Sequence, residues 1–225
     1  ETGPMTIGEY TIRTWDNTYR GTQTMSEVLQ HSSNVGMVFV QKKLGKEKTL
    51  TYLHSFGFGE PTGVDLQEET SPELRGDSQW YEIDLATASF GQGVAMTPLQ
   101  MVRAVGALAN EGWLMEPHVV REIRDEKGKT TTIRPKKVRQ VISAATAKVL
   151  TEMMVFAVDN GEAKWAKPAG YRIAGKTGTA QIPVAGHYDE KKTITSFVGF
   201  APADDPRFVM LITLREPSTS QWGSE

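Results

Sequence analysis

Two short segments of this 225-residue sequence carry the side chains best suited to chemistry. The first is Lys176-Thr177-Gly178-Thr179, and the Ile-Ala-Gly run before it predicts the end of a strand that lines a binding groove. The second is Ser32-Ser33-Asn34, which interrupts a helical pattern, so its turn can present a hydroxyl and a carboxamide on one surface. Together the two segments offer a positive charge, several hydroxyls and an amide for holding a polar substrate.

Each of these residues also has an ordinary structural explanation. Ser32 and Asn34, taken alone, are typical of a helix cap or kink, and Lys176 alone is typical of a solvated charge at a strand end. Gly91 and Gly93 favour a tight turn over a phosphate-binding loop, because no Lys-Ser or Lys-Thr pair follows them. The four histidines are far apart and lack the spacing of metal ligands: His31, His54, His118 and His187. We therefore expect no metal and no cofactor.

Composition limits the classes of protein to consider. The chain is long enough for a substantial core, and 39% hydrophobic and 23% charged residues are ordinary for a soluble globular protein. A net charge of -2 gives no electrostatic reason to expect a nucleic-acid partner. The absence of cysteine excludes disulfides and thiolate metal sites. No apolar run reaches the roughly 18 residues of a membrane span, and the opening Glu1-Thr2-Gly3-Pro4 does not resemble a signal peptide. The sequence does not begin with Met, from which we expect a processed or excised piece.

Local signals define the elements that must position the two segments. Thr24 with Glu27 is a capping box, Thr97-Pro98 is a strong helix start, and Ser143 caps a third helix. The expected helices are 24–44 with the turn inside it, 47–56, 84–90, 97–112 and 144–158. The expected strands are 119–124, 130–134, 173–182, 193–200 and 208–214. Helices followed by sequential antiparallel strands predict an α+β domain with a helical region attached, and a final three-stranded meander with one covered face.

A series of segments resembles the transpeptidase domain of class B penicillin-binding proteins. Ser32-Ser33-Asn34 resembles the family's Ser-x-Asn motif, and the run from Lys176 to Gln181 resembles its Lys-Thr-Gly motif. The other matching segments are 24–29, 56–59, 62–66, 89–93, 97–100 and 107–112. They follow the family's order and spacing along nearly the whole chain. The resemblance implies the penicillin-binding, serine β-lactamase-like fold, in which an antiparallel sheet packs with helices and carries a helical subdomain.

The family's third motif, Ser-x-x-Lys, carries the nucleophile and does not occur in the sequence, since no lysine has a serine or threonine three places before it. We therefore expect residues 1–225 to be a partial transpeptidase domain, truncated at both ends. Residues 1–160 would be the mostly helical part with the Ser-x-Asn motif, and 161–225 the strand-rich part with Lys-Thr-Gly. The run 221–224 resembles a loop that leads to a closing helix. Without its neighbours, strand 208–214 is expected to expose an apolar edge.

The resemblance implies a serine-type D,D-transpeptidase that cross-links peptidoglycan stem peptides through an acyl-enzyme and binds β-lactams. Ser32, Lys176 and Thr179 would be catalytic: Ser32 relays a proton towards the leaving group, Lys176 supplies a fixed positive charge and hydrogen-bonds Ser32, and the Thr179 backbone N–H is one oxyanion donor. The fragment itself is expected to be inactive and not to be acylated by penicillin.

Four residues would hold the substrate by the same resemblance. Asn34 would hold a substrate amide, and the hydroxyls of Thr177 and Thr179 would hold its terminal carboxylate. Gly178 would let the substrate lie close against the strand and antiparallel to it.

The implied partners are stem peptides that end in D-Ala-D-Ala, β-lactam antibiotics, the missing N-terminal part of the domain, and a membrane glycosyltransferase of the elongation or division machinery. The implied location is the extracytoplasmic face of the bacterial cytoplasmic membrane, with an anchor outside this chain. Two other readings stay open at this point. One is a non-catalytic module that binds cell-wall peptides, and the other is a β-lactamase-like hydrolase or sensor.

Overall fold

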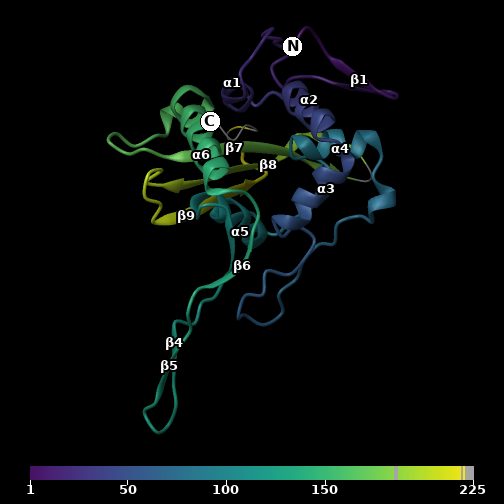
Figure 1. Ribbon diagram of the computed structural model, residues 1–225. Coiled ribbons are helices and arrows are strands. Elements are labelled where there is room, and N and C mark those ends of the chain that lie inside the picture. The colour runs from purple at the N-terminus through teal and green to yellow at the C-terminus, as the bar shows by residue number, and fades with distance from the viewer. Residues whose placement is uncertain (185–186, 219, 221–225) are drawn as a thin grey trace.

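A three-stranded antiparallel sheet forms the centre of the computed structural model, which describes residues 1–184, 187–218 and 220. Its strands are β7 (Ala174–Val184), β8 (His187–Ala201) and β9 (Phe208–Arg215), in the order β7-β8-β9 (Figure 1). The predicted final meander is therefore confirmed. The run 221–224, for which we expected a loop, lies outside the described residues.

One face of this sheet packs on two helices, α5 (Pro98–Ala109) and α6 (Ala144–Asn160). The register pairs Ala174 with Phe200 and Phe200 with Val209, which puts these three side chains on the same face. They form the core with Val105 of α5 and side chains of α6, and Phe200 is only 1% exposed. This packing fixes β7, the strand that carries the Lys-Thr-Gly motif, against the helical part of the chain.

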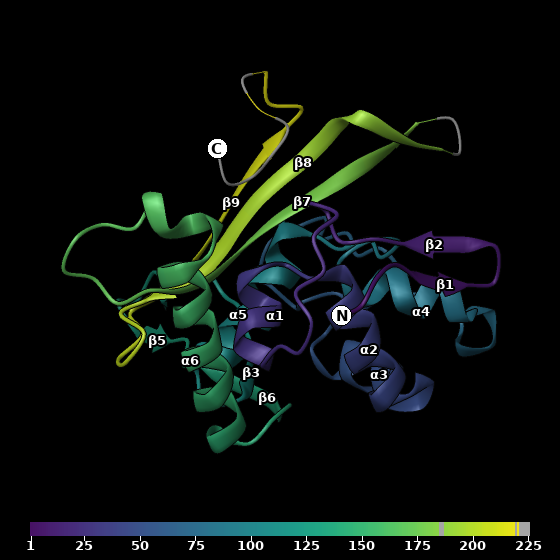
Figure 2. The ribbon, with the colours of Figure 1, turned by 90° about the horizontal axis from the view of Figure 1, so that it is seen from above.

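The opposite face of the sheet is largely open in the described part of the chain (Figure 2), where only Val158 and the segment 163–171 border it. We call it the uncovered face. Alternate side chains of β9 point to it and are 45–57% exposed: Phe208, Met210, Ile212 and Leu214. The expected exposed apolar strand is thus observed, and alternation confines the exposure to one face.

The Ser-x-Asn segment lies in a group of short helices, α1 (Met25–Gln30), α2 (Asn34–Leu44), α3 (Lys46–Ser55) and α4 (Glu82–Ser89). Val38 of α2 and Ala86 of α4 form a small core with two side chains near the N-terminus, Ile7 and Ile12, whereas α1 packs mainly on α6. The predicted helices are confirmed with boundary shifts of a few residues, and the expected turn divides 24–44 into α1 and α2.

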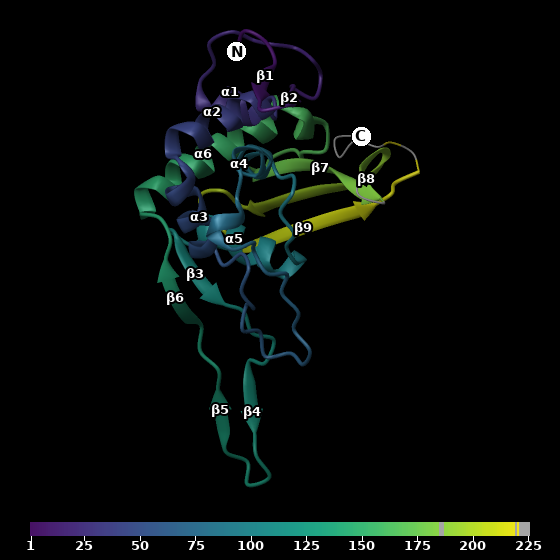
Figure 3. The ribbon, with the colours of Figure 1, turned by 90° about the vertical axis from the view of Figure 1, so that its right-hand side faces the viewer.

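Three small antiparallel pairs complete the chain: β1 (Met5–Ile7) with β2 (Tyr10–Ile12), β3 (Trp113–Glu116) with β6 (Lys136–Gln140), and β4 (Glu122–Arg124) with β5 (Thr130–Thr132). The β4–β5 hairpin was predicted, and it projects away from the body (Figure 3). The other strands were not predicted, because runs of three to five residues show too little alternation. Residues 1–160, expected to be mostly helical, thus also carry these strands. No helix in the described part is long and apolar enough to cross a membrane.

Two 3-10 turns lie between these elements, η1 (Asp77–Gln79) and η2 (Glu162–Trp165). The second follows α6 directly and leads the chain towards β7. It therefore brings its first residues beside the strand that carries the Lys-Thr-Gly motif.

Candidate active site

The turn between α1 and α2 holds Ser32 in an unusual backbone conformation. Ser32 has φ +50°, a left-handed value that is uncommon for a residue other than glycine. Two hydrogen bonds close the turn, from Ser32 N to Leu29 O at 3.2 Å and from Ser33 N to Val28 O at 3.0 Å. The helix cap is Ser33, whose hydroxyl accepts from Gly36 N at 2.9 Å. Capping therefore does not explain Ser32, and the left-handed turn instead aims its hydroxyl away from α2.

Close packing of α1 on α2 keeps this turn in place. A Cβ on Gly36 would lie 2.8 Å from a methyl carbon of Val28 and 3.2 Å from the Ser33 hydroxyl. Both distances are shorter than ordinary contacts, so only glycine allows this approach. The position of Ser32 thus depends on a glycine four residues further along the chain.

Two glycines of β7 have opposite surroundings. A Cβ on Gly175 would lie 2.4 Å from the Phe197 ring, so any larger residue there would have to displace that ring. A Cβ on Gly178 would meet nothing within 4 Å. Because the fold does not fill the space beside Gly178, a ligand can lie against the backbone there.

The structure brings the two segments together through a direct hydrogen bond. Lys176 Nζ donates to Ser32 Oγ, across 144 positions of sequence. The same ammonium donates to the backbone oxygen of Thr177 at 3.1 Å and to its hydroxyl at 3.3 Å. The Thr177 hydroxyl in turn donates to Glu162 Oε2 at 3.2 Å. Ser32, Lys176, Thr177 and Glu162 therefore form one hydrogen-bonded chain.

The charge on Lys176 is subject to two opposing effects. Burial lowers the pKa of Lys176 from its ordinary value of 10.5, and the negative charge of Glu162 raises it. The loss of hydration is the larger effect, so the net shift is downward. A lysine with a lowered pKa gives up a proton more readily than a solvated one, which suits a group that shares a proton with a serine hydroxyl.

Asn34 is the first residue of α2 and lies beside this chain of polar groups. Its side-chain nitrogen donates to the backbone oxygen of Arg13 at 2.9 Å. This bond leaves the side-chain oxygen as the atom that faces a possible donor on a ligand. Trp15 lies nearby, and its indole nitrogen donates to the backbone oxygen of His31 at 3.0 Å. The segment around Arg13 thus helps to form the site, although no sequence motif indicated it.

All predicted site residues line one cavity of about 500 Å³ between the helices and β7. Its polar and charged lining comes from Ser32, Asn34, Ser89, Gln92, Glu162, Lys176, Thr177, Thr179, Gln181 and Thr193. Gly178 also lines it, and among the described residues β8 is the only strand paired with β7. The other edge of β7 can therefore receive an extended peptide as an added strand.

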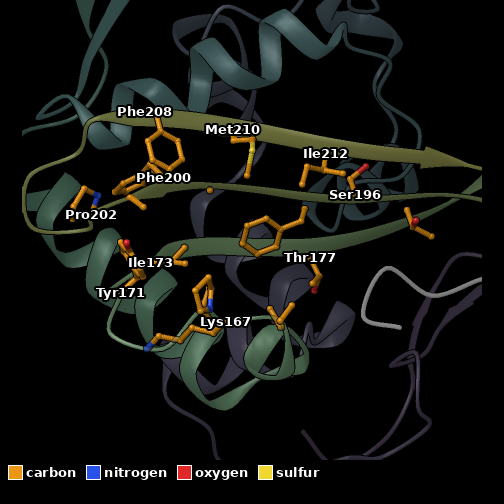
Figure 4. A pocket seen from close by; sticks show the side chains of 18 of the residues that line it. Lys167, Tyr171, Ile173, Thr177, Ser196, Phe200, Pro202, Phe208, Met210 and Ile212 are labelled. Carbon is orange, nitrogen blue, oxygen red and sulfur yellow. The ribbon is translucent and has the colours of Figure 1, made fainter.

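A second cavity of about 500 Å³ lies on the uncovered face of the sheet (Figure 4). Apolar side chains such as Phe208, Met210 and Ile212 line it, and Thr177 borders both cavities. It brings together no cluster of charged or nucleophilic groups, so the chemistry belongs to the first cavity.

Glu162 and Trp15 are among the lining residues that were not predicted as site residues from the sequence. Neither belongs to a recognisable motif; Glu162 follows Gly161 at the end of a helix, where an acidic residue is usually solvated. In the described part of the chain, no three histidine or acidic side chains are grouped as metal ligands would be.

Comparisons with protein families, with individual proteins and with solved structures all indicate the same family. The family profile described as "Penicillin binding protein transpeptidase domain" matches residues 1–225. Stage V sporulation protein D of Bacillus subtilis is 41% identical over 215 residues, covering 94% of this chain and 33% of that protein. A probable peptidoglycan D,D-transpeptidase, PenA of Neisseria flavescens, is 32% identical over 218 residues, and the match covers 96% of this chain and 52% of that protein.

A solved structure is also closely similar. Penicillin binding protein 3 from Mycobacterium tuberculosis, complexed with aztreonam, superimposes with a TM-score of 0.91 at 32% identity, over 98% of this chain and 51% of that one. The chain therefore spans between about a third and a half of the length of these relatives.

Proposed function

The chain belongs to the penicillin-binding protein transpeptidase family, and from this membership we propose that it forms the substrate-binding part of a peptidoglycan D,D-transpeptidase. The proposed substrates are stem peptides that end in D-Ala-D-Ala, and β-lactams would bind as their mimics. The observation that carries the proposal is the hydrogen bond from Lys176 to Ser32 inside a cavity that also holds Asn34 and Thr179.

The geometry supports a division of roles within this cavity. The Lys176 ammonium and the Thr179 hydroxyl offer charge-assisted hydrogen bonds to a terminal carboxylate, whereas the Thr177 hydroxyl already donates to Glu162. The Asn34 side chain, fixed by Arg13, can hold a peptide amide. The Thr179 backbone N–H belongs to β7 and could stabilise a developing oxyanion. Ser32 could pass a proton between Lys176 and the leaving amine, because its hydroxyl already accepts from that ammonium.

The nucleophile in this proposal is a serine from a Ser-x-x-Lys segment of the whole protein, since these 225 residues contain none. In the acylation step its hydroxyl oxygen bonds to the penultimate D-Ala carbonyl carbon, the peptide C–N bond breaks, and the hydroxyl proton passes to the departing D-alanine amine. An amine of a second stem peptide then displaces the serine oxygen and forms the cross-link.

Location and assembly follow as further parts of the proposal. Peptidoglycan lies outside the cytoplasmic membrane, so we place the enzyme on the extracytoplasmic face of that membrane. A glycosyltransferase that makes the glycan strands would be its natural partner there.

Acylation of the natural full-length protein by a fluorescent penicillin tests this function. We expect one labelled serine, and a fall of about 100-fold or more in the acylation rate constant for Lys176→Ala and for Ser32→Ala. Lys148→Ala is the matched control, because Lys148 is exposed on α6 and does not line the cavity. Labelling of Lys176→Ala at the wild-type rate would contradict the assignment. Binding of D-Ala-D-Ala peptides without any acylation would instead identify a non-catalytic binding module.

A further inference from the structure

Glu162 is the one acidic side chain among the described residues that line the cavity, and Lys176 is the one basic side chain. The remaining lining residues are neutral, including Ser32, Asn34 and Thr179. The electrostatics of this cavity therefore depend on one pair of opposite charges, and Glu162 has no part in the roles proposed above.

The backbone before Glu162 is held tightly in place. A Cβ on Gly161 would lie 2.4 Å from the backbone oxygen of Ala157 and 2.9 Å from that of Gln30. The side chain of Gln30 also donates to the backbone oxygen of Asn160 at 3.0 Å. After η2, an ion pair from Lys167 to Asp159 ties the chain back to α6. The backbone that leads into Glu162 is thus held between α1 and α6 at Gly161 and is not part of a free loop.

The direction of the hydrogen bonds follows from the number of protons available. A threonine hydroxyl has one proton and two lone pairs, whereas an ammonium can only donate and a carboxylate can only accept. The Thr177 proton must therefore go to Glu162 at 3.2 Å, and the Thr177 oxygen accepts from Lys176 at 3.3 Å. With this oxygen occupied, another proton of Lys176 is directed to Ser32.

We propose that Glu162 is a positioning residue, which acts through the Thr177 hydroxyl to keep the Lys176 ammonium charged and directed at Ser32. Its importance for catalysis rests on the proposed function, but the linkage itself does not. A ligand carboxylate that accepts a hydrogen bond from Thr177 would have to displace Glu162. The negative charge of Glu162 therefore also disfavours the binding of anions on that side of β7.

The effect of the Glu162 charge on the pKa of Lys176 has the direction that the proposal requires. Burial lowers the pKa of Lys176, and Glu162 opposes that effect. Removing the Glu162 charge leaves burial unopposed, so the pKa of Lys176 falls further and the neutral amine becomes more abundant at any pH below it. The other charged side chains of η2 and of its closing ion pair, Lys164, Lys167 and Asp159, do not line the cavity.

The test is an NMR titration of lysine side chains in the 225-residue chain, with Lys176 assigned from the variant Lys176→Arg. For Glu162→Gln we expect a lower titration midpoint, and a neutral fraction of Lys176 raised about threefold or more at pH values below it. Glu162→Asp should retain most of the wild-type midpoint. Glu47→Gln is the matched control, because Glu47 is an exposed acid on α3 outside the cavity, and it should leave the midpoint unchanged.

Thr177→Val separates action through the hydroxyl from simple proximity of the charge, and its similar shape preserves the strand. We expect it to shift the Lys176 resonance in the same direction as Glu162→Gln. An unchanged Lys176 titration in Glu162→Gln would overturn the proposal, and so would an unchanged resonance in Thr177→Val. The titration needs no substrate, so a protein that shows the linkage and yet is not acylated by penicillin would refute the function alone.

Discussion

Two neighbouring parts of β7 differ in what holds their residues. At the start of the strand, Ala174 is fully buried against Phe200, and Gly175 has the Phe197 ring against its Cα. In the part that follows, Lys176 donates to the Ser32 hydroxyl, and a Cβ on Gly178 would meet nothing within 4 Å. The first part, 174–175, is determined by packing within the sheet. The second part, 176–178, is shaped by a cavity, so its residue types are explained by a ligand better than by the fold.

This difference predicts that substitutions in the first part affect folding and that substitutions in the second part affect binding. The largest effect should come from Phe200→Ala. Phe200 is 1% exposed in the core that joins the sheet to α5 and α6, and truncating a buried phenylalanine costs about 3–5 kcal/mol. Denaturant unfolding measures this loss. A loss below about 1 kcal/mol would mean that this core does not hold β7.

A smaller decrease in the free energy of unfolding is expected for Gly175→Ala. The new Cβ would lie 2.4 Å from the Phe197 ring, which must move towards the uncovered face of the sheet. Such overpacking costs about 1–3 kcal/mol, and the ring has room to move, so the lower part of this range is expected. The same unfolding experiment with Phe197→Leu as background should reduce the loss, because the obstructing ring is gone.

Lys176→Met should stabilise the chain slightly, because it removes a charge that burial disfavours. The pKa of Lys176 is lower in the folded state than its unfolded value near 10.5. At pH values between the folded-state pKa and the unfolded-state pKa, the unfolded state therefore binds more protons than the folded state. Wild-type stability should therefore rise with pH through this window and level off above about 10.5. Unfolding midpoints measured across that range should lose this rise in Lys176→Met. An identical pH dependence in the two proteins would show that Lys176 is not responsible.

The smallest effect on stability is expected for Gly178→Ala, within about 0.5 kcal/mol of wild type. Nothing lies within 4 Å of the added methyl group, so the folded chain accommodates it. Peptide binding should nevertheless weaken, because the methyl group would occupy the surface on which the substrate lies. Gly175→Ala is the natural control for this variant, since it makes the same chemical change three residues earlier and should mainly affect folding.

Local signals explain how much of this fold could be predicted from the sequence. The helices began where expected because their caps are local: Thr24 accepts from Glu27 N, Thr97 from Gln100 N, and Ser143 from Thr146 N. The pairing of β3 with β6 was missed, because it joins residues 20 to 27 positions apart and neither strand shows a clear pattern by itself.

The site residues also divide into those that sequence motifs identified and those that only tertiary packing brings to the cavity. Ser32, Asn34 and Lys176 were found because their motifs resemble a known family, and the structure places all three on one cavity. Glu162 was not found, because its place depends on Gly161 fitting between α6 and Gln30 of α1, a contact across 131 positions of sequence. Sequence patterns report local structure, whereas this carboxylate is brought to the site by tertiary packing.

The most direct test of the account is to observe where a D-Ala-D-Ala peptide binds this chain. N-acetyl-D-Ala-D-Ala would be titrated into the isotope-labelled chain while backbone and side-chain resonances are followed by NMR. We expect saturable shifts at Ser32, Asn34 and residues 176–179, and their loss in Lys176→Met. Shifts confined to the uncovered face around Met210 and Ile212, or no saturable shift up to the solubility limit of the peptide, would contradict the assignment of this cavity as a substrate site.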